Sequence, residues 1–244
     1  MSYVLHLGDC LDPVTGLASL TDKSVDHVIT DPPFTQRTSE NMRSRKDAGD
    51  GGGYIGDSHR RRIDFDGIDG AEGQIVAETI RVSRRWCICF CALEQIGKYE
   101  SAAGKSWVRA TVWHRTNSAP QFTGDRPGQS CEGISIMHRA GRKRWNCGGR
   151  CAFYDGPTIN SVGDKDRGID HPTVKPTWLM ESLIRDFTDP GDTILDPFAG
   201  SGTTGVAAIR LGRNFIGFEK DPKYHAIAMK RLNAAREQLT MPGT

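Results

Sequence analysis

The sequence contains no long apolar run, and no stretch approaches the roughly 18 residues that a transmembrane helix needs. Its first residues, MSYVLHLGDC, lack the basic start and the apolar core of a signal peptide. We therefore expect a cytosolic protein that makes no membrane contact. With 244 residues, 37% of them hydrophobic, the chain is long enough for one large α/β domain with its own core.

A disulfide framework is missing as well. The seven cysteines are odd in number and show no regular spacing, which is typical of reduced thiols. Three of them alternate with large apolar residues in RWCICFCA (85–92), a strand pattern that places the thiols on one buried face. No CxxC pair occurs, so a zinc site built from Cys131, His138, Cys147 and Cys151 is the weaker interpretation, and we predict no metal.

The net charge of +2 does not by itself indicate a nucleic-acid-binding protein. The distribution of charge says more, because RAGRKRWNCGGRC (139–151) has five basic residues and no acidic one. The basic residues are Arg139, Arg142, Lys143, Arg144 and Arg150. Such clustering is expected of a surface that contacts phosphates, and the alternative is an ordinary solvated face.

Short β-rich runs alternate with helical patterns, which favours an α/β fold with a largely parallel sheet. The expected strands are 3–7, 25–30, 85–91, 108–114, 133–138, 192–196 and 214–219. The expected helices are 70–83, 93–103, 177–187, 203–211 and 222–238. In the last helix, Lys223, Lys230 and Arg231 are expected to face water. Residues 35–69 and 115–170 break the alternation, and we interpret them as excursions from a single domain, 1–244.

A glycine-rich turn stands between a strand and a helix in DTILDPFAGSGTTG (192–205), an arrangement that suits a nucleotide-like ligand. Gly200, Gly202 and Gly205 also satisfy GxGxxG, so a dehydrogenase has to be considered. Glu219, about 20 residues beyond the first glycine, would suit ribose hydroxyls in either case. Asp-Pro-Phe before the glycines is not a dehydrogenase feature, and little chain follows to build a second nucleotide-binding half. We therefore expect a single nucleoside.

Three motifs carry a family resemblance. DPPF (31–34), HPTVKP (171–176) and DPFAGSGTTG (196–205) resemble the amino-group DNA methyltransferases that use S-adenosylmethionine, in the β order of motifs. The opening LHLGDC (5–10) is similar to that family too. The resemblance implies a Rossmann-like class I methyltransferase fold, a doubly wound and mostly parallel sheet. It also implies that an inserted target-recognition region lies between the motifs, which we place at 115–170. From the irregular, polar composition of 35–69 we predict a mobile loop that contacts DNA. Protein glutamine methyltransferases place a similar motif after the glycine loop, which argues against them.

The first motif fits the chemistry of methylating an exocyclic amine, whose lone pair is delocalised into the base. Asp31 would accept one amine hydrogen and the carbonyl of Pro32 the other, while the rings of Pro32 and Pro33 keep that segment rigid. Phe34 would stack on a base flipped out of the duplex. The alternative is a strand that two prolines stop, without chemistry. An aspartate in first position is associated with adenine N6 and a serine with cytosine N4, so the resemblance favours adenine.

The resemblance also implies a set of cofactor-binding residues. Glu219 would bind the ribose hydroxyls, and His171, Thr173 and Lys175 would lie at the methionine end, unless HPTVKP is only a turn that enters a helix. The whole set expected to hold S-adenosylmethionine is Asp9, Cys10, Asp31, His171, Thr173, Lys175, Phe198, Gly200, Ser201, Gly202, Thr203, Glu219 and Lys220.

Double-stranded DNA is the expected partner. Its contacts are expected from the five basic residues of 139–151 and from Arg37, Arg43, Arg45 and Lys46. By resemblance we also expect a homodimer of bacterial or phage origin, and the sequence shows no nuclease motif, which leaves a separate restriction nuclease open. Three alternatives stay open: methylation of cytosine N4, methylation of RNA, and a nucleic-acid-binding module without catalysis.

Overall fold

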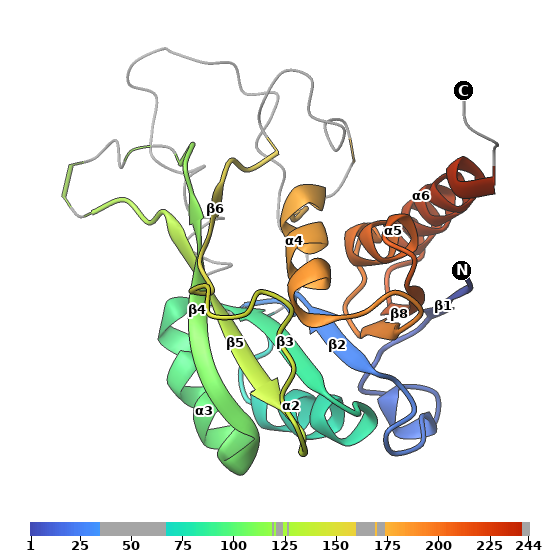
Figure 1. Cartoon of the computed structure of the whole chain (residues 1–244), viewed down its shortest axis with the longest axis horizontal. Helices are drawn as coiled ribbons and strands as arrows, with labels where there is room; N and C mark the ends of the chain where they lie inside the picture. The colour runs from blue at the N-terminus through green and yellow to red at the C-terminus, as the bar shows by residue number, and fades with distance from the viewer. Residues whose placement is uncertain are drawn as a thin grey trace.

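One eight-stranded sheet organises the part of the chain that the structure describes (Figure 1). The structure is a computed structural model, and it describes residues 1–34, 67–118, 120, 124–125, 127–159, 169 and 174–240. The strand order is β1-β8-β7-β2-β3-β5-β4-β6, and within it only β5 runs antiparallel to its neighbours. The strands are β1 Tyr3–Leu7, β2 His27–Thr30, β3 Trp86–Cys91, β4 Trp107–Arg115, β5 Cys131–His138, β6 Tyr154–Gly156, β7 Thr193–Asp196 and β8 Asn214–Glu219.

Helices cover both faces of the sheet. They are α2 Glu72–Val82, α3 Ile96–Ala103, α4 Thr177–Phe187, α5 Thr203–Arg210 and α6 Pro222–Thr240, with short 3-10 turns at Leu17–Ser19, Leu93–Gln95 and Gly104–Ser106. Figure 1 shows α4, α5 and α6 on one side and α2 and α3 on the other. The predicted fold class is confirmed. Over the described ranges, no helix combines the length and apolar character needed to cross a bilayer.

All of the predicted strands and helices are present, and their ends agree to within two residues, except that the first turn of the helix expected at 93–103 is a 3-10 turn. The sequence pattern missed β6, which has only three residues and pairs with β4 at the edge of the sheet. An element this short has no room for the apolar alternation that reveals a strand.

The alternation in β3 separates two cores. Trp86, Ile88 and Phe90 belong to the cluster that includes residues of α4 and α5, whereas the intervening cysteines belong to the cluster that includes α2 and α3. All six residues of β3 are buried. This confirms the prediction that the thiols of Cys87, Cys89 and Cys91 serve as core packing.

The direction of winding changes between β2 and β7, which lie side by side in the sheet. The chain leaves β2 toward α2 on one face and leaves β7 toward α5 on the other. Two crossovers that depart to opposite faces open a crevice at the carboxyl ends of their strands. The DPPF motif follows β2 and the glycine loop follows β7, so both motifs lie at this crevice.

Candidate active site

The first motif lies at the carboxyl end of a fully buried strand, β2. Pairing of β2 with β3 ends at Thr30, and Asp31 to Phe34 continue as irregular chain. Proline has no backbone N–H and cannot extend the ladder, which explains why the strand stops there. The carbonyl of Phe34 accepts a hydrogen bond from the backbone N–H of Ile68 at 3.1 Å, which fixes the end of the motif.

The carboxylate of Asp31 has one occupied oxygen and one open oxygen. Oδ2 accepts a hydrogen bond from Nζ of Lys175 at 2.6 Å, whereas Oδ1 is buried and has no partner among the described residues. Burial raises the pKa of Asp31, the charge of Lys175 opposes that shift and Glu132 adds to it. Oδ1 therefore keeps an unused acceptor position beside the end of β2.

Lys175 lies between two carboxylates. Its Nζ is 2.6 Å from Oδ2 of Asp31 and 3.2 Å from Oε2 of Glu132, and it stands over the rings of Phe34 and Phe90 at 5.3 and 5.1 Å. Burial alone would lower the pKa of Lys175, but the two carboxylates outweigh it and the pKa is raised. The side chain is thus a charged ammonium.

The expected cofactor contact of Lys175 stays a prediction. The resemblance assigned Lys175 to the carboxylate of the methionine, and in the structure its ammonium is paired with Asp31 and Glu132. His171 and Thr173, assigned to the same end of the cofactor, lie outside the described residues. Sequence reasoning missed Glu132, because one glutamate at the start of a strand carries no recognisable signal.

A buried carboxyl joins the two motifs. Asp196 ends β7, and its Oδ1 accepts a hydrogen bond from the hydroxyl of Thr30 in β2 at 2.7 Å. Its Oδ2 accepts one from the hydroxyl of Thr204 in α5 at 2.6 Å. Burial raises the pKa of Asp196 from 3.8 to about 6, although hydrogen bonds from Thr204, Thr30 and the amide of Phe198 oppose the shift.

Glu219, expected at the ribose, shapes the glycine loop. Its two carboxylate oxygens accept hydrogen bonds from the backbone N–H groups of Gly200 and Asp221, both at 2.8 Å. A carboxylate has about four lone-pair positions, so these two bonds leave acceptors for the hydroxyls of a ligand. Burial raises the pKa of Glu219.

The hydroxyls of the glycine loop are engaged by a residue that the sequence interpretation placed in water. Arg231 of α6 donates from Nη1 to the carbonyl of Ser201 at 2.7 Å, to its Oγ at 3.1 Å and to Oγ1 of Thr203 at 3.0 Å. The prediction of a solvent-facing Arg231 is therefore wrong. Gly202, with φ of +80°, lets the loop approach α6 so closely that a Cβ there would lie 2.9 Å from Cβ of Ala228. Ser201 and Thr203 are buried against this helix.

The other residues expected at the cofactor lie at the carboxyl ends of the strands, because they follow the parallel strands β1, β7 and β8. Asp9 is exposed just beyond β1, where its Oδ1 accepts a hydrogen bond from the amide of Leu11 at 2.9 Å. Cys10 is buried, and burial raises the pKa of its thiol to about 12. Phe198 packs partly buried after β7, and Lys220 is exposed after β8.

The basic cluster of 139–151 begins at the opposite end of the strands from Asp31, beside the amino end of β3. β5 runs antiparallel to β3, so it carries the chain away from Asp31, and the amide of Arg139 bonds to the carbonyl of Arg85 at 3.0 Å. Trp86, the first residue of β3, donates from Nε1 to the carbonyl of Arg144 at 2.7 Å. These contacts place the start of the cluster away from Asp31, and its expected contact with phosphates stays a prediction.

Three of the five basic side chains also hold the protein together. Arg139 donates to the carbonyls of Ile80 and Arg81, Arg144 pairs with Asp189 at 2.9 Å, and Arg150 pairs with Asp186 at 2.7 Å. Arg142 and Lys143 are exposed. The remaining residues expected to contact DNA, Arg37, Arg43, Arg45 and Lys46, lie outside the described residues.

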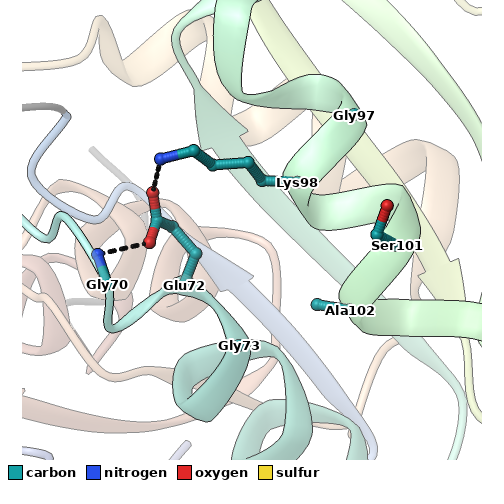
Figure 2. A pocket seen from close by; sticks show the side chains of 7 residues that line it. All are labelled: Gly70, Glu72, Gly73, Gly97, Lys98, Ser101 and Ala102. Atoms are coloured by element: carbon teal, nitrogen blue, oxygen red, sulfur yellow. Dashed lines mark hydrogen bonds and ion pairs between the residues drawn. The ribbon is translucent and has the colours of Figure 1, made fainter.

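Elsewhere, an open groove lies between α2 and α3 (Figure 2). Lys98 reaches across it to Glu72 at 2.7 Å, and the other lining residues are small: Gly70, Gly73, Gly97, Ser101 and Ala102. None of these residues was expected in the site. Where the structure describes the chain, no three metal-ligating side chains gather, and Cys147 instead donates to Asp186 at 2.8 Å.

Residues 25–230 match a family model described as DNA methylase. Over 136 residues, the chain is 39% identical to the type II methyltransferase M2.DpnII of Streptococcus pneumoniae, which covers 52% of this chain and 51% of that protein. Over 133 residues it is 39% identical to M2.LlaDCHI of Lactococcus lactis subsp. cremoris, with 50% and 49% covered. The chain thus spans about half the length of these curated relatives.

Solved structures share the fold. The complex of M1.HpyAVI with SAM superimposes with a TM-score of 0.68 at 23% identity, covering 95% of this chain and all of that one. The PvuII DNA methyltransferase, described as cytosine-N4-specific, superimposes with a TM-score of 0.67 at 16% identity, covering 98% and 93%. At these identities the likeness concerns the fold.

The raised pKa of Asp196 makes a prediction about stability. Because the pKa rises from 3.8 to about 6 on folding, the contribution of this group is fully present below pH 3.8 and is lost as the pH rises through 6. Asp196→Asn stays neutral at every pH and can still bond to both threonines. From about pH 3.5 to 7 its free energy of unfolding should therefore gain roughly 3 kcal/mol relative to the parent. Urea denaturation at several pH values measures this, and a constant difference would contradict it.

Proposed function

The chain belongs to the DNA methylase family, and we propose that it transfers a methyl group from S-adenosylmethionine to the N6 amine of an adenine in DNA. The observation that carries this proposal is the state of Asp31. Its Oδ1 is buried without a hydrogen-bond partner among the described residues, just beyond the end of β2 beside β7, while its Oδ2 is held by Lys175. An acceptor of this kind is what an exocyclic amine needs before it can attack.

The residues present fit the cofactor. The glycine loop, the spare lone pairs of Glu219 and the exposed Asp9 lie at the ends of neighbouring parallel strands, where a nucleoside binds in folds of this type. When bound, S-adenosylmethionine supplies a methyl group activated by a sulfonium. We propose that Gly200, Phe198 and Glu219 hold it beside the motif that carries Asp31.

The protein's own groups would prepare the amine. Asp31 accepts one hydrogen through Oδ1 and the carbonyl of Pro32 accepts the other, which directs the nitrogen lone pair toward the methyl donor. As the new N–C bond forms, the amine gives up a proton, for which the Asp31 carboxylate is the adjacent base. Phe34, partly buried against the core, offers its ring to a flipped base.

Adenine is preferred to cytosine because residue 31 is aspartate and because the family resemblance links that residue to N6 chemistry. Cytosine N4 is the second candidate, since the cytosine-specific PvuII enzyme has the same fold. RNA as substrate and binding without catalysis are outcomes that the assay below distinguishes.

We propose that DNA approaches the end of the strands at which Asp31 lies. The last residues of β4 and β6 and the first residues of β5 lie at the same end of the strands as Asp31, so the described residues that follow β4, precede β5 and follow β6 start there. In this proposal only the two outer parts of the region 115–170 would face the DNA, because β5 carries the chain between them to the other end of the strands. A homodimer is proposed on the resemblance alone, and light scattering would test it.

Asp31→Asn tests the proposed reaction. The amide presents a hydrogen-bond donor or a weaker acceptor to the amine, so methyl transfer should fall by at least about a hundredfold. Activity is measured by transfer of labelled methyl groups from S-adenosylmethionine to unmethylated genomic DNA, followed by analysis of the nucleosides. The expected product is 6-methyladenine.

Asp22→Asn serves as the matched control. Asp22 has a side chain that is 60% exposed and contacts Arg81 and Arg139, far from the crevice, so this variant should keep the parent's activity. Label found only in cytosine would transfer the proposal to N4. An Asp31→Asn variant that is as active as the parent would refute the assigned role, and a preference for RNA over a matched DNA would change the substrate.

The double variant Arg142→Ala, Lys143→Ala tests where DNA lies. Each phosphate contact contributes about 0.9 to the slope of log affinity against log salt concentration, so two lost contacts would lower the slope by nearly two. We expect an unchanged slope, because this segment lies at the end of the strands opposite to Asp31. Fluorescence anisotropy with a labelled duplex at several salt concentrations measures it. A reduced slope would restore the sequence-based expectation of phosphate contacts here.

A further inference from the structure

A row of alternating charges runs behind the carboxylate of Asp31. Nη1 of Arg115 is 3.4 Å from Oε1 of Glu132, and Oε2 of Glu132 is 3.2 Å from Nζ of Lys175, which in turn contacts Asp31 at 2.6 Å. The row crosses from the end of β4 to the start of β5 and on to the end of β2. Its inner members are largely buried, with side-chain exposures of 15% for Glu132, 10% for Lys175 and 20% for Asp31.

Each member is held in place by groups other than its neighbours in the row. Arg115 also donates from Nη2 to the carbonyl of Gln129 at 2.8 Å, so its guanidinium has a fixed position. The backbone of Glu132 pairs with Trp113 in the sheet. The ammonium of Lys175 is bounded by the rings of Phe34 and Phe90. If Lys175 swung toward another partner, Asp31 would be left as a buried charge without compensation, and Glu132 would keep only Arg115.

We propose that Glu132 is a positioning residue, which holds the Lys175 ammonium on Oδ2 of Asp31 and thereby leaves Oδ1 to accept the substrate amine. With Glu132 present, Lys175 is shared between two carboxylates. Without its charge, Lys175 would bind Asp31 alone and withdraw electron density from the oxygen that meets the amine. This inference rests on the proposed function.

The charge on Glu132 also adjusts the basicity of Asp31. The charged groups that face Asp31 are Lys175, Glu132 and the buried Asp196, and the neighbouring Cys91 and Tyr99 stay neutral because burial raises the pKa of both. Among them, Lys175 lowers the pKa of Asp31 and Glu132 raises it. Removing the charge of Glu132 should therefore lower the pKa of Asp31, whereas removing Arg115 should raise it, since Glu132 would then be less compensated.

Titration of Asp31 in the full chain gives a test that does not depend on turnover. Aspartates are labelled with 13C at the carboxyl carbon, and the Asp31 signal is assigned by its loss in Asp31→Asn. The titration midpoint should fall by at least about half a pH unit in Glu132→Gln and rise in Arg115→Gln. Glu100→Gln, which removes an exposed charge from α3, should leave the midpoint unchanged. Unchanged midpoints in Glu132→Gln and Arg115→Gln would overturn the inference.

Kinetics supply the second readout. In Glu132→Gln we expect kcat to fall about tenfold and the acid limb of its pH profile to move to lower pH, while KM for S-adenosylmethionine changes by less than about twofold. A role limited to folding would lower the active fraction and leave the limb in place, which would count against the proposal. If the parent chain fails to methylate any nucleic acid, the proposed function fails, whereas an active parent with an unshifted Glu132→Gln profile refutes only the role of Glu132.

Discussion

The buried hydrogen bond from Thr30 to Asp196 is the constraint on which the site depends. It joins the last residue of β2 to the last residue of β7 at the position where the winding of the sheet reverses. Asp31 follows the first strand and the glycine loop follows the second, so this bond sets the distance between the proposed acceptor of the amine and the proposed cofactor loop. The cost is a carboxyl buried far from water, which shows in its raised pKa.

Charge behind the site is arranged to occupy one oxygen of Asp31 and leave the other open. Lys175 alone would form a simple ion pair, which would weaken the aspartate as an acceptor. Glu132 divides the attraction of Lys175, and Arg115 fixes Glu132 in turn. Arg231 plays a comparable part on the cofactor side, where it engages the carbonyl of Ser201 and the hydroxyls of Ser201 and Thr203 and so fixes the glycine loop against α6.

The fold, the DPPF motif and the glycine loop could be predicted from the sequence, since each depends on residues that are close together in the chain. Apolar alternation gave β3 its two faces, and prolines after a buried run gave the end of β2. The roles of Lys175 and Arg231 could not be predicted in this way. Both depend on which charged groups come together from elements far apart in the chain, and such contacts leave no mark in local spacing.

The sequence by itself determined which groups are present: an aspartate before two prolines and a glycine loop after a strand. The alternation of strands and helices places both at the carboxyl ends of parallel strands. Only the tertiary structure decided which oxygen of Asp31 has no hydrogen-bond partner and at which end of the strands the basic residues of 139–151 begin. The physical reason is that β5 runs antiparallel to β3. Its first residues bring Glu132 to Lys175, and its last residue leads to Arg139 at the opposite end of the strands.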